Sequence, residues 1–243
     1  CDTEQLHSAL VSVIATKPHS GVSLRYYLLL VLGSEAGSVK RVPQVLWSET
    51  QGNRSARQGF EDVWLAQYLS DREPTARVSS QGQGERLVRY VDRALVAQPL
   101  ISIIIPTMGK LELIKPCIET LNTLTEYSNY EVIILDNSRG NYPEGISYLK
   151  SKAVKLVECD FKFNWPQLNN IGVSHCSGEY LLFLNDDIEI TDPSWLGELL
   201  KQAQRSEVGA VGPMLYYPEG KIQHAGVRLV NQGGGATHLF HKL

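Results

Sequence analysis

The sequence predicts an α/β protein with a mostly parallel sheet and helices on both faces, preceded by a smaller α+β segment. The first observation is a set of apolar runs rich in Val, Ile and Leu at 100–105, 131–136, 154–159 and 180–184. Runs of this kind are typical of parallel strands buried on both faces. The second observation is that segments with helical spacing separate most of these runs. Strands that alternate with helices form right-handed crossovers within one sheet.

The first 98 residues follow a different pattern. Apolar residues between Leu6 and Ile14 recur at helical spacing, which predicts an opening helix. We expect an extended segment at 39–49, a loop at 51–59 and a second short helix at 60–69.

Domain boundaries follow from the composition. Residues 71–98 are polar and rich in turn formers, with one candidate strand at 86–91. We therefore divide the chain into an N-terminal segment at 1–70, a linker at 71–98 and a main domain at 99–243.

Three helices are expected in the main domain from their starting residues. Pro116 suits the first position of a helix, where its missing N–H costs nothing. Asn164 opens a second helix over 164–178. Asp192 caps a third, after which 208–213 is expected to return as a strand.

Composition excludes several classes of protein. The 243 residues are 43% hydrophobic and 20% charged, as in a soluble globular protein. The net charge of −3 argues against a nucleic-acid partner, which calls for a clustered basic surface. The apolar run at 26–33 is far shorter than the ~20 residues that span a bilayer. The chain begins at Cys1 without a basic signal-peptide region, so we expect a processed protein or a fragment of a longer one.

Polar residues follow three of the predicted strands. Pro106 and Thr107 end the first, and Asp136 ends the second. The residues that follow the fourth are Asn185, Asp186 and Asp187. Ligands of parallel sheets bind at the carboxyl edge of the strands, and paired carboxylates suit Mg²⁺ or Mn²⁺. A solvated turn is the alternative for the acidic triplet taken alone.

Several common site motifs are absent from the sequence. The segment after the first predicted strand, "PTMGKLE", matches neither the dinucleotide-binding motif G-x-G-x-x-G nor a P-loop. No serine nucleophile elbow occurs. The strand ends therefore carry the functional argument.

Four blocks of sequence resemble family 2 glycosyltransferases, in family order and spacing over residues 99–240. They are "ISIIIPTMGKLELIKPCIETL", "YEVIILDNS", "FNWPQLNNIGVSHCSGEYLLFLNDDIEI" and "VGAVGPMLYYPEGKIQHAGVRL". The likeness is greatest to bacterial enzymes that build O-antigen and rhamnose-containing polysaccharides. Upstream, "RVPQVLW" resembles the end of a preceding transferase domain in tandem members.

The resemblance implies a GT-A fold and a metal-dependent enzyme that takes a nucleotide-diphospho-sugar donor and inverts the anomeric centre. The nucleotide-binding residues that it implies are Pro106, Thr107, Asp136, Asn170 and Asp186. The Mg²⁺ or Mn²⁺ ion would be held by Asp187 and Asn185, although Asn185 stands where the family usually has an acid. We expect Asp187 to be the direct ligand, and Asp186 to be a second ligand or to orient water.

Other positions match the family with more than one interpretation. Asn164 is expected to cap its helix. The positions implied as donor or acceptor contacts are Asn169, His224 and His238, each of which has packing as its alternative role.

The resemblance also implies partners and limits. The acceptor would be a saccharide or lipid-linked saccharide, and the enzyme would be cytoplasmic or peripheral at the inner face of the cell membrane. The family's general base lies in a block that we expect downstream of Leu243, so we assign no catalytic residue and expect this chain alone to be inactive and to self-associate. The alternatives are a non-catalytic sugar-nucleotide-binding or scaffolding module and a nucleotidyltransferase.

Overall fold

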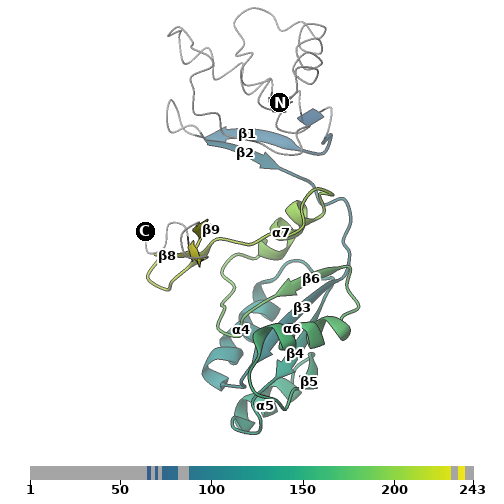
Figure 1. Cartoon of the computed structure of the whole chain (residues 1–243). Helices are drawn as coiled ribbons and strands as arrows, with labels where there is room; N and C mark the ends of the chain where they lie inside the picture. The colour runs from purple at the N-terminus through teal and green to yellow at the C-terminus, as the bar shows by residue number, and fades with distance from the viewer. Residues whose placement is uncertain (1–64, 67–68, 71–72, 82–87, 231–234, 239–243) are drawn as a thin grey trace, which may run out of the picture. The chain divides into compact units, whose positions relative to one another are not determined.

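The computed structural model describes residues 65–66, 69–70, 73–81, 88–230 and 235–238 (Figure 1). The chain divides into two compact units, residues 1–94 and residues 95–243. The predictions for 6–14, 39–49 and 51–59 lie outside the described residues. Of the helix predicted at 60–69, the described residues Leu65, Ala66 and Leu69 are helical.

The first unit contains a β-hairpin. Strand β1 (Arg77–Gln81) pairs antiparallel with β2 (Val88–Asp92), with Arg77 opposite Asp92. Arg93 donates to the carboxylate of Glu73 just beyond the hairpin. The segment predicted as a linker thus contains two paired strands.

The second unit is built on a four-stranded sheet in the order β5-β4-β3-β6. The strands are β3 (Ile101–Thr107), β4 (Tyr130–Asp136), β5 (Lys155–Glu158) and β6 (Tyr180–Phe183). All three pairings are parallel. The predicted fold class and the four predicted strands are confirmed.

Alternation along the central strands gives the sheet two apolar faces. Ile103 and Ile105 belong to a core formed with α4 (Leu111–Leu124), α5 (Pro143–Lys150) and α7 (Trp195–Ala203). Ile104 belongs to a second core on the opposite face, under α6 (Trp165–Ser174). Helices therefore cover both faces (Figure 1), as the apolar runs without polar alternation predicted.

Helix α6 approaches the sheet closely because Gly172 faces it. A Cβ added at Gly172 would lie 2.6 Å from Cγ2 of Ile104 and 3.3 Å from Cδ1 of Leu135. The helix also begins as predicted, since the Asn164 side chain accepts a hydrogen bond from Gln167 N. It ends at Ser174, four residues before the predicted end.

The prediction that Pro116 starts a helix is wrong. Helix α4 begins at Leu111, so Pro116 lies inside it, where a proline costs about 3 kcal/mol. The apolar face explains the earlier start, because Ile114, Cys117, Ile118 and Leu121 are all fully or almost fully buried. Burial of such side chains is worth roughly 1.5–3 kcal/mol each, which outweighs the lost hydrogen bond.

Two further predictions about helix and strand boundaries are corrected. Asp192 is not the cap of α7; its Oδ1 accepts hydrogen bonds from N and Oγ of Ser194, which is itself the N-cap. Residues 208–213 do not form a strand. Gly209, Gly212 and Pro213 weaken strand pairing there. Helix α5 was not predicted, although Pro143 stands at its start.

The chain beyond α7 forms two small antiparallel pairs. Strand β7 (Leu215–Tyr216) pairs with β8 (Ile222–His224), and β9 (Val227–Val230) pairs with β10 (Gly235–His238).

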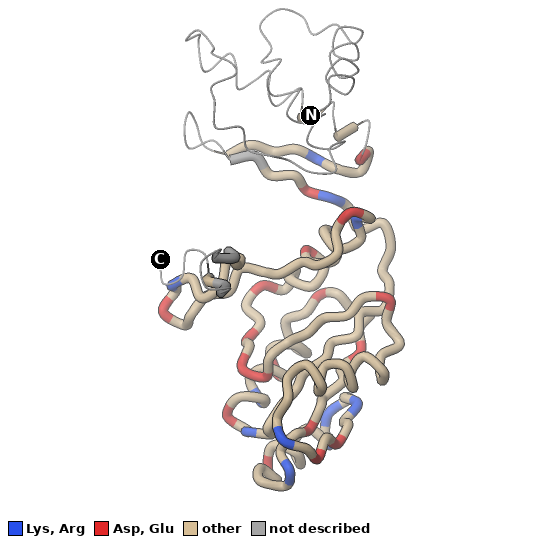
Figure 2. Tube along the Cα trace, viewed as in Figure 1, with Lys and Arg blue, Asp and Glu red and all other residues tan. Residues whose placement is uncertain are grey.

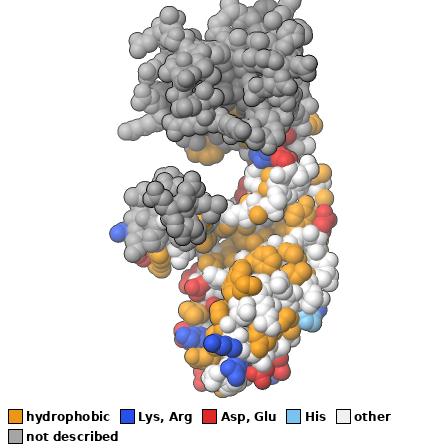
Figure 3. Space-filling model, viewed as in Figure 1, with side chains coloured by type: hydrophobic (Ala, Val, Ile, Leu, Met, Phe, Trp, Pro, Cys, Tyr) orange, Lys and Arg blue, Asp and Glu red, His pale blue; other side chains and the backbone are white. Residues whose placement is uncertain are grey.

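An apolar surface lies along β6, the outer strand of the sheet. Leu181 and Phe183 are nearly half exposed, and the Trp165 ring lies with its centroid 6.5 Å from that of Phe183. Hydrophobic side chains gather over part of the face shown in Figure 3.

Candidate active site

The carboxyl ends of three parallel strands lie at one edge of the sheet. Thr107 and Asp136 are paired in register at the ends of β3 and β4. Strand β6 stops pairing with β3 at Phe183, where Leu184 N donates to Ile104 O. The predicted residues of these three strand ends are therefore brought together.

Pro106 explains why β6 separates from β3 at this point. The backbone groups of residues 101 and 107 form hydrogen bonds on the β4 side of β3. The carbonyl of Ile104 accepts a hydrogen bond on the β6 side. By alternation, Pro106 also faces the β6 side, where it has no N–H to donate. The chain after β6 is thus released to form a loop over the sheet edge, and we call Asn185–Asp187 the aspartate loop.

A side-chain hydrogen bond joins the aspartate loop to β3. Thr107 Oγ1 donates to Asp186 Oδ2 at 2.6 Å and accepts from Gly109 N at 2.9 Å. Thr107 itself is buried. The hydroxyl therefore fixes the position of Asp186 and the course of the β3–α4 loop together.

Helix α4 contacts the aspartate loop and the residues that follow it. Cys117 Sγ contacts the carbonyl of Asn185 at 3.7 Å as a weak donor, and Thr120 Oγ1 accepts from Ile190 N at 3.0 Å. Burial, together with the charges of Asp186 and Asp187, raises the pKa of Cys117 to about 12. The thiol stays protonated and keeps its donor role.

The two carboxylates of the aspartate loop repel each other. Burial raises the pKa of Asp186, and the charge of Asp187 raises it further. The hydrogen bond from Thr107 and the positive charge of Lys110 act in the opposite direction, but the net shift is upward. A bound cation would relieve this cost.

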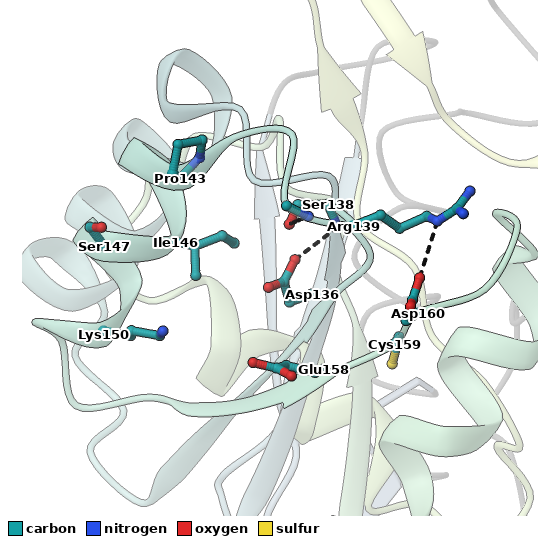
Figure 4. Close-up of a pocket in the computed structure, with 11 residues that line it drawn as sticks. Asp136, Ser138, Arg139, Pro143, Ile146, Ser147, Lys150, Glu158, Cys159 and Asp160 are labelled. Atoms are coloured by element: carbon teal, nitrogen blue, oxygen red, sulfur yellow. Dashed lines mark hydrogen bonds and ion pairs between the residues drawn. The ribbon is translucent and has the colours of Figure 1, made fainter.

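A pocket of about 370 Å³ opens beside the ends of β4 and β5 (Figure 4). One wall is α5, with Pro143, Ile146, Ser147 and Lys150. The opposite wall follows β5 and contains Glu158, Cys159 and Asp160. Asp136 lies between the two walls, at the end of β4.

One oxygen of Asp136 has a structural role. Its Oδ1 accepts from Ser138 N at 2.8 Å, which forms a tight turn after β4. Among the described residues, no hydrogen bond is recorded to Asp136 Oδ2. The carboxylate can therefore accept one further hydrogen bond from a ligand in the pocket.

The turn after β4 also shapes the pocket's other side. Arg139 has a positive φ of 53°, and its guanidinium pairs with Asp160 at 3.2 Å. Asn137 Nδ2 donates to the carbonyls of Cys159 and Phe161. These contacts join the β4 and β5 loops around the pocket.

The remaining predicted residues lie on elements other than β3, β4 and the aspartate loop. Asn169 is buried in α6, where its Nδ2 donates to Trp165 O and its Oδ1 has no hydrogen-bond partner among the described residues. Asn170 is exposed on the same helix. His224 lies in β8, and His238 ends β10.

The oxygen atoms of the aspartate loop suit a hard cation that takes only part of its coordination shell from the protein. No group of three or more His, Cys, Asp or Glu side chains with metal-binding geometry is found among the described residues. Asp187 and Asn185 are exposed, and Asp186 is turned toward Thr107. Mg²⁺ commonly uses one or two carboxylates and completes its shell with phosphates and water. The residues fit such an ion.

Sequence reasoning missed most of the pocket walls. Helix α5 was not predicted, so Ile146 and Lys150 had no assigned place. Pro143 followed by Glu144 marked its start and was the available signal. Charges of both signs are interspersed along the described part of the second unit (Figure 2), so charge clustering gave no signal either.

Comparisons with known proteins identify relatives of this chain. The sequence model of "Glycosyl transferase family 2" matches residues 102–236. O-antigen biosynthesis protein RfbC of Myxococcus xanthus is 36% identical over 229 residues, which are 89% of this chain and 18% of that protein. GalNAc(5)-diNAcBac-PP-undecaprenol beta-1,3-glucosyltransferase of Campylobacter jejuni is 23% identical, over 51% of this chain and 41% of that protein. The chain thus spans less than half the length of either relative.

Among solved structures, the chain is similar to mannosyltransferase PcManGT from Pyrobaculum calidifontis in complex with GDP-Man and Mn²⁺. The TM-score is 0.45 at 21% sequence identity, covering 51% of this chain and 37% of that one. In the described part of the chain, no helix is both long and apolar enough to cross a membrane.

Proposed function

The chain belongs to glycosyl transferase family 2, and on that premise we propose that residues 99–243 form the donor-binding part of a metal-dependent, inverting glycosyltransferase. The donor is a nucleotide-diphospho-sugar, and the product is a bacterial surface polysaccharide. The similarity to an O-antigen biosynthesis protein supports this product class.

One observation carries the proposal. The hydrogen bond from Thr107 to Asp186 joins the end of β3 to the aspartate loop, while Thr107 is also in register with Asp136 at the pocket. A ligand with a nucleoside at one end and a diphosphate at the other matches this arrangement. The nucleoside lies in the pocket of Asp136, and the diphosphate lies by the aspartate loop.

The residues have separate roles in this proposal. Asp136 Oδ2 accepts a hydrogen bond from the base or ribose. Asp187, with Asn185, holds a Mg²⁺ or Mn²⁺ ion, and Thr107 keeps Asp186 oriented beside it. When bound, the cation stabilises the negative charge that develops on the departing nucleoside diphosphate.

The acceptor is a saccharide or lipid-linked saccharide at the inner face of the cell membrane. The similarity to an enzyme whose name includes an undecaprenol-linked substrate supports this class. Inversion requires direct attack by an acceptor hydroxyl and a general base to take its proton. No residue of this chain is assigned that role.

The test is nucleoside diphosphate binding by calorimetry, with UDP, dTDP, GDP, ADP and CDP in the presence of Mn²⁺. We expect at least one to bind the wild-type chain, and Asp136→Ala to weaken that nucleotide with or without metal. Glu119→Gln, an exposed acid on α4, serves as the control. Failure of all five nucleotides to bind would reject the proposal. A full-length enzyme that binds donor but transfers no sugar to any acceptor would favour a non-catalytic binding module.

A further inference from the structure

The β3–α4 loop lies between the pocket and the aspartate loop. On one side, Thr107 Oγ1 joins it to Asp186. On the other side, Gly109 packs on the pocket wall, since a Cβ added there would lie 2.9 Å from Cδ1 of Ile146 and 3.4 Å from Cβ of Ser138. Gly109 also has a φ of 80°, which favours glycine. The β3–α4 loop therefore contacts both the pocket wall and the aspartate loop.

The next residue along the β3–α4 loop, Lys110, carries a positive charge. Its Nζ lies 6.0 Å from the centroid of the Tyr142 ring, immediately before α5 begins. This distance is the outer limit of a cation–π contact, so the ring holds the ammonium weakly. Lys110 also lowers the pKa of Asp186 slightly through its charge, as the smallest of the influences on that carboxyl, so the ammonium lies within electrostatic range of the aspartate loop.

Two lysines of the second unit pair with carboxylates, and Lys110 is not one of them. Lys115 pairs with Glu119, and Lys201 pairs with Glu198. Among the described residues, no ion pair to a carboxylate is recorded for Lys110. A half-buried lysine without an acidic partner is available to an anionic ligand.

Charge balance calls for such a cation. A divalent ion held by Asp187 and Asn185 offsets the charges of Asp186 and Asp187, whereas a nucleoside diphosphate adds about two to three negative charges. Lysine is well suited to this role because its ammonium binds phosphate as a compact point charge.

We propose that Lys110 binds the diphosphate of the donor, as the protein's own positive charge between the nucleoside pocket and the aspartate loop. This inference rests on the proposed function and adds a residue to the binding site. It concerns the diphosphate alone, so a nucleoside monophosphate should depend on Lys110 much less.

The experiment compares ligands that differ only in phosphate. Calorimetry with Mn²⁺ measures the binding of the best nucleoside diphosphate, its monophosphate and inorganic pyrophosphate to wild type, Lys110→Ala and Lys110→Arg. We expect Lys110→Ala to weaken the diphosphate and pyrophosphate about tenfold and the monophosphate less than twofold, and Lys110→Arg to retain most of the affinity.

Lys152→Ala is the matched control, because Lys152 also lies over a tyrosine ring, with Nζ 4.8 Å from the centroid of Tyr148. It should change none of the affinities. Thermal unfolding checks that each variant folds, and Lys110→Gln replaces Lys110→Ala if the alanine variant does not.

The outcomes separate the two proposals. Wild-type binding of a nucleoside diphosphate with no selective loss in Lys110→Ala or Lys110→Gln would overturn the inference and leave the proposed function standing. Equal losses for diphosphate and monophosphate would also overturn it. Absence of nucleotide binding by the wild type would reject both.

Discussion

Thr107→Val removes the hydroxyl that joins β3 to the aspartate loop and keeps the shape of the side chain. The wild-type hydroxyl donates to a carboxylate at 2.6 Å and accepts from Gly109 N at 2.9 Å. A hydrogen bond to a charged group contributes about 1.5–3 kcal/mol and one to a neutral group about 0.5–1.5 kcal/mol. Because Thr107 is buried, water cannot fully replace either bond. We expect a loss of about 2–4 kcal/mol in the free energy of unfolding.

The same substitution should weaken the site. Without the Thr107 hydroxyl, Asp186 loses a hydrogen bond that lowers its pKa, so the pKa rises further. The carboxyl is then charged less of the time and attracts a cation less strongly. Urea unfolding at pH 7 measures the stability change, and calorimetry measures nucleoside diphosphate affinity with Mn²⁺. Both quantities should fall.

Two variants serve as controls for this prediction. Thr107→Ser keeps a hydroxyl and should retain most of the stability and affinity. Thr123→Val removes a hydroxyl that donates to the carbonyl of Glu119 on the exposed face of α4, and should have little effect. A Thr107→Val protein that matches wild type in both assays would refute the role given to this hydrogen bond.

Two further predictions concern stability and association. Burial favours the neutral form of Glu131, but the hydrogen bonds from Ser102 and the backbone of Ser177 outweigh it, so the folded pKa lies below its ordinary value of 4.5. The carboxylate therefore stabilises the fold above the unfolded pKa, and this contribution is lost as pH falls through the folded pKa. Glu131→Gln should lower the free energy of unfolding at pH 7 and change it little at pH 3. An equal loss at both pH values would contradict the assignment. The apolar surface along β6 should make the chain self-associate, and Leu181→Lys should shift sedimentation toward monomer. Monomeric wild type at high concentration would reject that expectation.

The sheet was predictable because its strands are apolar on both faces. Ile103, Ile104 and Ile105 are all fully buried. Three consecutive isoleucines can all be buried in a central parallel strand because both faces of such a strand are covered. The pairing of Thr107 with Asp136 followed from the same strands ending together.

The ends of helices and strands were harder to predict where local sequence signals and packing favour different positions. Pro116 indicated a helix start, but the buried face around Ile114 extended α4 by five residues toward the N-terminus. At 208–213, an apolar pattern predicted a strand, and these residues do not form one. Both cases depended on long-range packing that no local window contains.

The strand-end residues of the candidate site could be predicted from the sequence, whereas the walls of its pocket could not. The strand ends identified Thr107, Asp136 and the aspartate loop, whereas the pocket also needs α5, which approaches Gly109 closely. A Cβ added at Gly145 would lie only 1.9 Å from the carbonyl oxygen of Gly109. Such a close approach of two backbones is invisible in the sequence except as two glycines.

The most direct test of the account is the metal dependence of nucleoside diphosphate binding, measured by calorimetry with Mn²⁺ and with a chelator. The account predicts tighter binding with Mn²⁺, and it predicts that Asp187→Ala reduces affinity about a hundredfold, to the level seen with the chelator. Asp136→Ala should weaken binding equally in both conditions. Equal affinity of the wild-type chain with and without Mn²⁺ would contradict the assignment of Asp187 and the central claim of a metal-dependent donor site.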